Sequence, residues 1–290
     1  MRIEVLVDVK TTLGEGPLWD AEEQRLYWID SFDGRVFRCT ADGRELRAWD
    51  VSQKIGSMCL RRSEGAIVSL ARGLHVLDFK TGDVSLIADP EPDRPNNRLN
   101  DGKVDKQGRF IVGSMDTMEE GPNGALYRLD PDLTVTKLEA GIIVSNGPCW
   151  SPDGNIFYFT DTWSGEISAY DYDQKAGTLR NKWRFCRMMD DVGAFDGATV
   201  DAEGCVWSAH VYAGRIVRYT PDGNVDRVVD MPVKKVTSVM FGGPELDILF
   251  VTSMAQPPLP RFPGDGVLRG SLFAIHELGV RGVPEPRFAG

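Results

Sequence analysis

Cysteine and histidine are scarce in this sequence, which argues against most sulfur- and imidazole-based sites. The 290 residues contain five cysteines and three histidines, and no two cysteines form a C-x-x-C pair. An odd number of scattered cysteines fits neither a disulfide framework nor a zinc knuckle, and such thiols are typical of a reducing compartment. We interpret His75 as a packed strand residue and His276 as peripheral, and we leave a pocket contact open for His210.

Positive charge and long apolar runs are also in short supply. Lys and Arg number 33 against 43 Asp and Glu, so the formal net charge is −10. Such a surface repels phosphate backbones and anionic lipids, so neither nucleic acid nor a membrane is expected as a partner. No apolar run approaches the about 18 residues that span a bilayer, and the first residues lack the apolar core of a signal peptide. We therefore expect a cytoplasmic protein.

No stretch has a persuasive helical pattern, and what the sequence contains instead is repetition. Six segments share a polar residue beside glycine followed by a short apolar strand, and they start about 41 to 50 residues apart, which is the period of a four-stranded propeller blade. A polar turn and a β-branched or aromatic strand, such as residues 156–159, follow each start. The six segments start at Leu13, Ile55, Leu99, Ser145, Phe195 and Val236.

These repeats predict an all-β fold: a six-bladed β-propeller with four antiparallel strands per blade, formed by residues 1–290 as a single domain. Few residues remain after the third strand of the sixth repeat, whereas residues 3–9 form a lone strand before the first repeat. We therefore expect the N-terminal strand to be the outer strand of the last blade. This arrangement closes the ring and leaves no open edge, so no obligate protein partner is needed.

The residues at the start of each repeat are expected to form a ring of oxygen-bearing side chains at one mouth of the central channel. Burying several carboxylates and amides together costs several kcal/mol per unpaired charge unless a cation is present. Oxygen-only ligands suit a hard ion such as Ca²⁺ or Mg²⁺. The ring members are Glu15, Ser57, Asn100 with Asp101, Asn146, Asp196, and Thr237 or Ser238.

Four motifs resemble the SMP-30/gluconolactonase/regucalcin family, in the right order and at blade spacing. They are Leu13-Gly14-Glu15-Gly16-Pro17, residues 97–105 (NRLNDGKVD), Ser145-Asn146-Gly147-Pro148 and Phe195-Asp196-Gly197. The resemblance implies that Glu15, Asn146 and Asp196 bind one divalent cation. It also implies that Arg98 and Asn100 bind substrate. Another acidic substrate contact is expected after Gly113-Ser114-Met115; Glu119 is our choice, with Glu120 or neither residue left open.

The resemblance further implies hydrolysis of a sugar lactone to its aldonic acid. The cation would act as a Lewis acid on the ring carbonyl, and Asp196 would be the general base that takes a proton from water. Ca²⁺ is favoured, with Mg²⁺, Mn²⁺ or Zn²⁺ as alternatives. Gluconolactone, xylonolactone, arabinonolactone and a sulfo-sugar lactone all remain open as substrates.

A non-catalytic calcium-binding or regulatory protein of the regucalcin type is the alternative interpretation. The pair Arg98 and Asn100 argues against it, because a calcium buffer needs no substrate donors.

Overall fold

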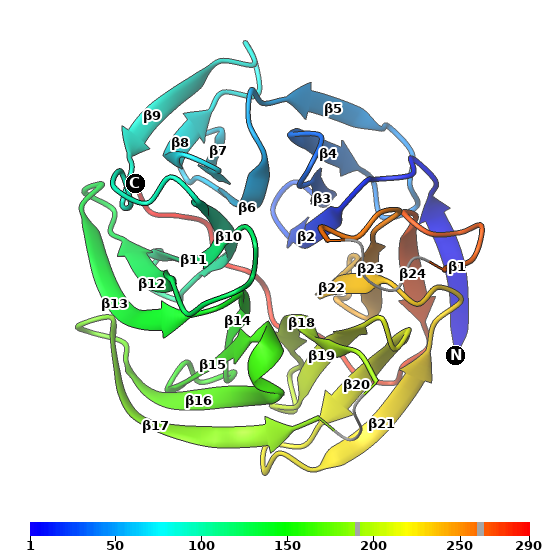
Figure 1. Cartoon of the computed structure of the whole chain (residues 1–290). Coiled ribbons are helices and arrows are strands. Elements are labelled where there is room, and N and C mark those ends of the chain that lie inside the picture. Colours follow the sequence, from blue (N-terminus) through cyan, green and yellow to red (C-terminus); the bar gives the residue numbers. More distant parts are fainter. Residues whose placement is uncertain (189–191, 260–263) are drawn as a thin grey trace.

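The computed structural model describes residues 1–188, 192–259 and 264–290, and it confirms the predicted six-bladed β-propeller (Figure 1). Six antiparallel sheets of four strands surround a central channel, and the first strand of each of the six repeats lies nearest to the channel. These innermost strands combine β-branched and small residues that are buried on both faces, as expected for strands in the centre of a closed ring.

Each of the first three blades takes four consecutive strands. Blade 1 contains β2 (Gly14–Asp20), β3 (Arg25–Asp30), β4 (Arg35–Cys39) and β5 (Arg47–Asp50). Blade 2 contains β6 (Ile55–Leu60), β7 (Ala66–Leu70), β8 (Gly73–Leu77) and β9 (Val84–Ala88). Blade 3 contains β10 (Asn97–Val104), β11 (Phe110–Asp116), β12 (Gly124–Leu129) and β13 (Val135–Ile142).

Blades 4 and 5 follow the same plan, and blade 6 is completed by the first strand of the chain. Blade 4 contains β14 (Ser145–Trp150), β15 (Ile156–Asp161), β16 (Glu166–Asp173) and β17 (Thr178–Arg187), with the 3-10 turn η1 (Thr162–Ser164) after β15. Blade 5 contains β18 (Ala194–Val200), β19 (Val206–Val211), β20 (Arg215–Tyr219) and β21 (Val225–Asp230). Blade 6 contains β22 (Val236–Gly242), β23 (Ile248–Ser253), β24 (Leu272–His276) and β1 (Arg2–Val7).

The ring closes where the sequence predicts. β1 pairs antiparallel with β24, with Arg2 opposite His276 and Val5 opposite Phe273. The N-terminal strand is therefore the outer strand of blade 6, beside strands that lie more than 200 residues away in the sequence. The edge that β24 would otherwise expose is covered.

The core is divided into six clusters, one between each pair of neighbouring blades. Between blades 3 and 4, for example, Ile111 and Leu126 pack against Phe157 and Tyr170. A seventh and smaller apolar cluster lies at the channel mouth and contains Leu13, Ala194, Val211 and Met254, with Trp163 and Tyr212 packed against it. The blades thus hold one another in place, and the innermost strands are fixed around the axis.

A β-bulge interrupts each innermost strand at its polar motif. The register with the second strand shifts between Glu15 and Leu18 in blade 1 and between Asn146 and Cys149 in blade 4. The other four innermost strands carry the same irregularity. Bulges re-aim side chains and are common beside active sites. Gly16 and Gly147 supply the positive φ values of 49° and 58° that these two bulges need.

The last residues of the chain cross the face opposite the mouth, visible as the red segment behind the channel in Figure 1. Gly282 bonds to blade 6 and Phe288 to blade 2, through N–H···O distances of 2.8 Å to Leu246 and Leu60. Ala289 continues to blade 3, where its N–H lies 2.9 Å from the Gly108 carbonyl. The segment therefore ties together blades that are distant along the chain.

Within residues 1–188, 192–259 and 264–290, no helix has the length and apolar character needed to cross a membrane.

Candidate functional site

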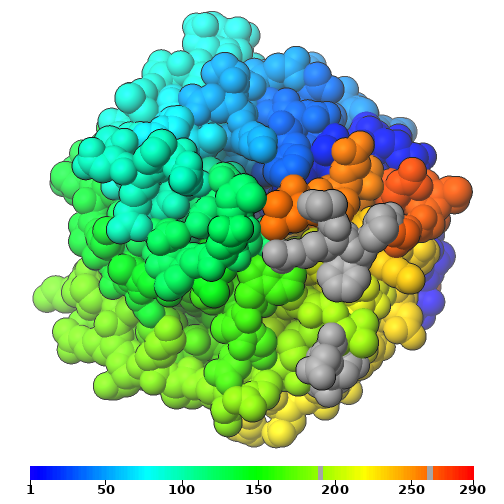
Figure 2. All heavy atoms as spheres, in the orientation of Figure 1, coloured from blue at the N-terminus to red at the C-terminus, as the bar shows by residue number. Residues whose placement is uncertain are grey.

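All six residues predicted for the site line one cavity at the channel mouth. They come from the starts of four innermost strands and from the loop after β11. Figure 2 shows this face of the molecule, where loops from several blades surround the centre of the ring. The six are Glu15 on β2, Arg98 and Asn100 on β10, Glu119 in the loop, Asn146 on β14 and Asp196 on β18.

The other members of the predicted ring do not reach this cavity. Ser57 donates its hydroxyl to the Asn100 carbonyl at 2.7 Å, and Thr237 donates to the Gly14 carbonyl at 2.5 Å. Asp101 lies deeper in the channel, where its two oxygens accept the N–H groups of Gly102 and Gly147, each at 2.8 Å. These residues fasten the innermost strands to one another instead of facing the mouth.

A directed chain of hydrogen bonds connects the site residues of blades 3 and 4. The Arg98 Nη1 donates to Asn100 Oδ1 at 2.6 Å. The Asn100 Nδ2 donates to Asn146 Oδ1 at 3.1 Å and to the Ser145 carbonyl at 2.8 Å. A guanidinium can only donate and a backbone carbonyl can only accept, so both partners impose one orientation on the Asn100 amide. The Asn100 amide in turn places the Asn146 oxygen.

The half-buried Glu15 and the buried Asp196 line the same cavity, and their carboxylates interact electrostatically. Burial, together with the negative charge of Asp101, raises the pKa of Glu15 to about 8. Burial and the charge of Glu15 raise the pKa of Asp196 well above its ordinary value. Asp196 is 6 % exposed, and its Oδ1 has no hydrogen-bond partner among the described residues.

These observations fit a cation between Glu15, Asp196 and the Asn146 amide oxygen. A buried carboxylate oxygen without a donor is costly, and two carboxylates that repel each other resist ionisation. A bound divalent cation relieves both penalties, and the donor set contains oxygen alone. The cavity thus brings together three oxygen-bearing side chains of the kind that hard cations prefer.

Arg98 provides the positive charge of the site. Burial lowers its pKa to about 10, although the negative charges of Glu15, Glu119 and Asp196 oppose this effect. A guanidinium with that pKa remains charged at neutral pH. Arg98 is 6 % exposed, and Nη1 also donates to the Leu99 carbonyl at 3.1 Å. One side of the guanidinium is therefore fixed to the protein.

The loop after β11 places Glu119 and Glu120 differently. Glu119 lines the cavity, and its Oε2 accepts the indole N–H of Trp163 at 2.7 Å. Glu120 is exposed and does not line the cavity. Asp116 instead stabilises the loop by accepting the Met118 N–H and the Asn123 amide, each at 2.9 Å.

Sequence reasoning missed the contributions of the second strands and of the apolar rim. Thr162 and Trp163 follow β15 and line the cavity together with Tyr212, which follows β19, and with Met254, which follows β23. The signal was available in the polar segment Asp161-Thr162-Trp163-Ser164-Gly165, which ends a second strand without an ordinary hairpin turn. His210 is fully buried beside Tyr219, with 3.1 Å between Nε2 and the hydroxyl, and does not line the cavity.

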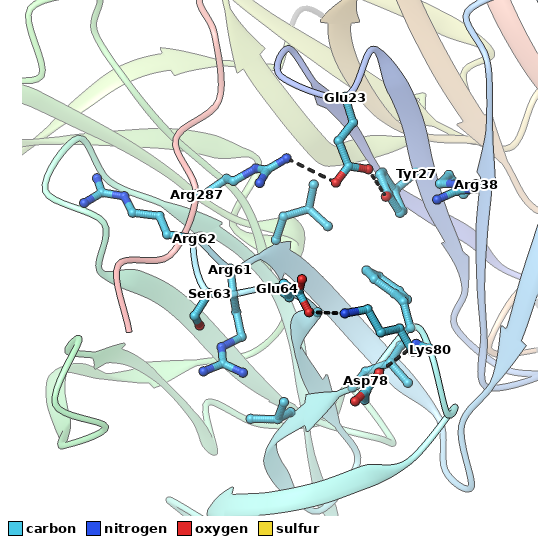
Figure 3. Close-up of a pocket in the computed structure, with 15 residues that line it drawn as sticks. Glu23, Tyr27, Arg38, Arg61, Arg62, Ser63, Glu64, Asp78, Lys80 and Arg287 are labelled. Atoms are coloured by element: carbon cyan, nitrogen blue, oxygen red, sulfur yellow. Dashed lines mark hydrogen bonds and ion pairs between the residues drawn. The ribbon is translucent and has the colours of Figure 1, made fainter.

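Two other features are weaker candidates for a site. A cavity of about 340 Å³ lies between blades 1 and 2 on the opposite face (Figure 3), and two of its basic side chains, Lys80 and Arg287, pair with acidic ones. Lys80 is 2.6 Å from Glu64, and Arg287 is 3.6 Å from Glu23 and 2.6 Å from Asp20. None of the six predicted site residues lines this cavity between blades 1 and 2.

The acidic group of Asp201, Glu203 and Cys205 could hold a metal by distance alone, because its ligand atoms lie within 4.8 Å of one another. The Asp201 Oδ1 accepts two backbone N–H groups at 3.0 Å each. Its Oδ2 accepts the Trp207 indole and the Arg218 guanidinium, each at 2.8 Å. Arg218 therefore already occupies the place of a cation, and the group is a buried ion pair.

Comparison with known proteins gives a consistent result. A sequence model of the family described as "SMP-30/Gluconolactonase/LRE-like region" matches residues 13–255. Regucalcin from Xenopus laevis is 33% identical over 296 residues, which cover 100% of this chain and 99% of the relative. The 6-deoxy-6-sulfogluconolactonase of Pseudomonas putida is 33% identical over 290 residues, which cover 99% of each chain.

A solved structure of a relative has the same fold. The calcium-binding protein regucalcin from Agrobacterium tumefaciens superposes with a TM-score of 0.89 at 29% identity, covering 99% of this chain and 97% of that chain.

Proposed function

Because this chain belongs to the SMP-30/gluconolactonase/LRE-like family, we propose that it hydrolyses a sugar lactone to the aldonic acid with one divalent cation. One observation carries the proposal. The mouth cavity combines an oxygen-only ligand set, Glu15, Asn146 and Asp196, with a buried arginine that a simple cation buffer does not need.

Glu15, Asn146 and Asp196 are the proposed protein ligands of the cation. Ca²⁺ is favoured, and Mg²⁺, Mn²⁺ or Zn²⁺ can occupy the same oxygens. When bound, the cation supplies Lewis-acid polarisation of the lactone carbonyl and stabilises the negative charge that develops on its oxygen. The chain of bonds from Arg98 through Asn100 keeps the Asn146 amide oxygen in place for this role.

Arg98, Asn100 and Glu119 are the proposed substrate contacts. The Arg98 guanidinium has five N–H groups in a rigid fork, and the bonds to Leu99 and Asn100 both use Nη1. The remaining donors suit the hydroxyl and ring oxygens of a polyol. Glu119 accepts one N–H from Trp163 through Oε2 and lines the same cavity as Arg98 and Asn100, where a carboxylate suits a substrate hydroxyl donor.

Asp196 is the proposed general base. One oxygen of its carboxylate can accept a proton from a water molecule that attacks the carbonyl, while the other contacts the cation. In the cation-free protein, burial and the charge of Glu15 favour the protonated form of Asp196, and a bound cation would restore the ionised form that a base requires. The proton can then pass to the ring oxygen that leaves when the C–O bond breaks.

The proposal is tested with a panel of aldonolactones that includes gluconolactone, xylonolactone, arabinonolactone and 6-deoxy-6-sulfogluconolactone. Proton release is followed at constant pH before EDTA treatment, after it, and after single divalent ions are restored. We expect hydrolysis that chelation abolishes and one ion restores. Turnover at the spontaneous rate with every ion would contradict the enzymatic proposal for this panel.

A second candidate function is calcium binding without catalysis. It is favoured by the relatives named regucalcin, one of which is described as a calcium-binding protein. Both functions predict saturable cation binding by calorimetry. Only the lactonase predicts turnover that depends on Arg98, so an Arg98→Met variant that binds the cation but loses hydrolysis separates them.

A further inference from the structure

The 3-10 turn η1 contacts both halves of the site through two consecutive residues. Thr162 and Trp163 follow β15 and line the same cavity as the six predicted residues. Thr162 bonds to the proposed cation ligand Asn146, and Trp163 bonds to the proposed substrate contact Glu119. A single short turn therefore touches groups that come from β14 and from the loop after β11.

Thr162 completes the directed chain that begins at Arg98. The Asn146 Nδ2 donates to Thr162 Oγ1 at 2.8 Å, and Thr162 is 5 % exposed. Because Asn100 already donates to Asn146 Oδ1, the amide nitrogen of Asn146 has to face an acceptor on the other side. The threonine hydroxyl oxygen is that acceptor. Without it, the Asn146 amide would leave a buried N–H unsatisfied or turn over.

Trp163 restricts Glu119, which lies in a strained segment of its loop. The Glu119 backbone has a φ of 56°, a value that non-glycine residues seldom adopt. The indole N–H binds Glu119 Oε2 at 2.7 Å, and the ring packs on the apolar mouth cluster. The carboxylate is thus held by a large, partly buried side chain with few available rotamers.

The turn itself is anchored to the beginning of β14. The Asp161 carboxylate accepts the N–H groups of Ile143 and Val144, each at 3.0 Å. The Thr162 N–H donates to the Val144 carbonyl at 2.9 Å. Since Asn146 follows two residues later, η1 and the proposed cation ligand are parts of one fixed unit.

From these contacts we propose that η1 is the positioning element of the site, a role that rests on the function proposed above. Thr162 holds the Asn146 amide with its oxygen toward the cation. Trp163 holds Glu119 in the orientation that determines which lactone is accepted. Neither residue takes part in the chemistry, and both act through a neighbour that does.

The role of Thr162 is tested by cation affinity, which does not depend on turnover. Thr162→Val removes the acceptor, and Thr162→Ser keeps it. We expect the valine variant to bind Ca²⁺ 10- to 100-fold more weakly by calorimetry, about the loss typical of an outer-shell partner, whereas the serine variant stays within about threefold.

Thr160→Val is the matched control for the same replacement. Thr160 is buried on β15, two residues before Thr162, and its hydroxyl has no partner among the described residues, so its loss should leave the dissociation constant unchanged. If Thr162→Val does not fold, Thr162→Ala carries the same test. Wild-type affinity in the folded variant, or equal losses in the Thr160 and Thr162 variants, would overturn the proposal for Thr162.

The role of Trp163 is tested by the balance between KM and kcat. Trp163→Phe keeps a ring but loses the donor, so Glu119 becomes less restrained. We expect KM for the preferred lactone to rise about tenfold and kcat to stay within about threefold of the wild-type value. The order of preference among the lactones of the panel should change, whereas the cation affinity should stay the same. Trp183→Phe is the control, since Trp183 is 39 % exposed and does not line the cavity.

An unchanged KM and an unchanged order of substrates in Trp163→Phe would overturn the proposal for Trp163. The proposed lactonase function and the proposed role of η1 can be rejected separately. If the wild-type protein hydrolyses no lactone, the proposed function fails, while the affinity measurements on the Thr162 variants still decide whether η1 positions a cation ligand.

Discussion

At the scale of single residues, the position of Asp196 explains why its chemistry is unusual. Its carboxylate is buried near that of Glu15, and one of its oxygens has no donor among the described residues. The same arrangement that suits a cation ligand also raises the affinity of Asp196 for a proton. The Asp196 carboxylate can therefore be both cation ligand and general base, provided that one oxygen binds the cation and the other accepts the proton.

The first residue-scale prediction concerns Asp196→Asn. We expect kcat for lactone hydrolysis to fall by about 10²- to 10⁴-fold, the usual contribution of a general base, with cation affinity reduced but still saturable. The measurement is steady-state hydrolysis at saturating cation, with circular dichroism to verify the fold. Glu120→Gln is the control, because Glu120 is exposed and lies outside the cavity. A kcat within twofold of wild type would remove Asp196 from the mechanism.

The sequence was sufficient to predict which residues meet at the mouth but not how they are oriented. Glu15, Asn146 and Asp196 all begin innermost strands, so the repeat period alone brings them to one end of the channel. Thr162 and Trp163 follow a second strand, and no repeat places them there. Their contacts depend on how β15 ends, which is a tertiary property. The choice between Glu119 and Glu120 likewise depended on the path of one loop.

At the scale of elements, the bulges and the C-terminal segment shape the channel from opposite ends. The bulges in β2 and β14 coincide with Glu15 and Asn146, which line the mouth cavity, and a bulge re-aims side chains relative to the regular alternation of a strand. In the sequence, these bulges are marked only by the Gly-Pro and Asp-Gly pairs at the polar motifs. The C-terminal segment was not assigned a role from sequence, because its irregular backbone has no periodicity to read.

The element-scale prediction concerns the anchor of the C-terminal segment. Phe288 is fully buried between blades 2 and 3, and its backbone pairs with Leu60 and Arg62. We expect Phe288→Ala to lower the free energy of unfolding by about 3–5 kcal/mol, as for other fully buried phenylalanines. Leu86→Ala, at a site that is 63 % exposed, should change it by less than about 0.5 kcal/mol.

Urea unfolding of the three proteins at one pH and one cation concentration provides the measurement. Equal midpoints for Phe288→Ala and Leu86→Ala would show that the segment lies loosely on the propeller instead of tying blades 2 and 3 together.

At the scale of the whole molecule, stability and site chemistry are linked through the buried carboxylates. The pKa of Glu15 is raised to about 8 and that of Asp196 is raised as well, so the folded cation-free protein binds more protons than the unfolded chain at neutral pH. Stability from these groups is therefore complete at low pH and is lost as the pH rises through the folded-state values.

The whole-molecule prediction is that cation binding changes how the free energy of unfolding depends on pH. In EDTA, we expect the free energy of unfolding to fall between pH 6.5 and 8. In excess Ca²⁺, the part of this fall that Glu15 and Asp196 contribute should disappear, because the cation keeps both carboxylates ionised. The free energy of unfolding should also rise by about 4 kcal/mol at a Ca²⁺ concentration about 1,000-fold above Kd. Urea titrations at the two pH values check both statements.

Glu285 is the control for groups that respond to pH without the cation. It lies on the channel side of the C-terminal segment, where burial raises its pKa to about 7. Glu285→Gln should remove part of the slope in EDTA and in Ca²⁺ alike. An EDTA-treated protein that becomes more stable from pH 6.5 to 8 would contradict the proposed pairing of Glu15 and Asp196.

The pairing of β1 with β24 also has a consequence for how the protein is made. β1 leaves the ribosome well before its partner β24, because the paired residues Arg2 and His276 lie far apart in the sequence. During synthesis, five blades can assemble in turn while β1 has no neighbour to join. The nascent chain must therefore carry an unpaired strand until β24 has been translated, a state prone to aggregation.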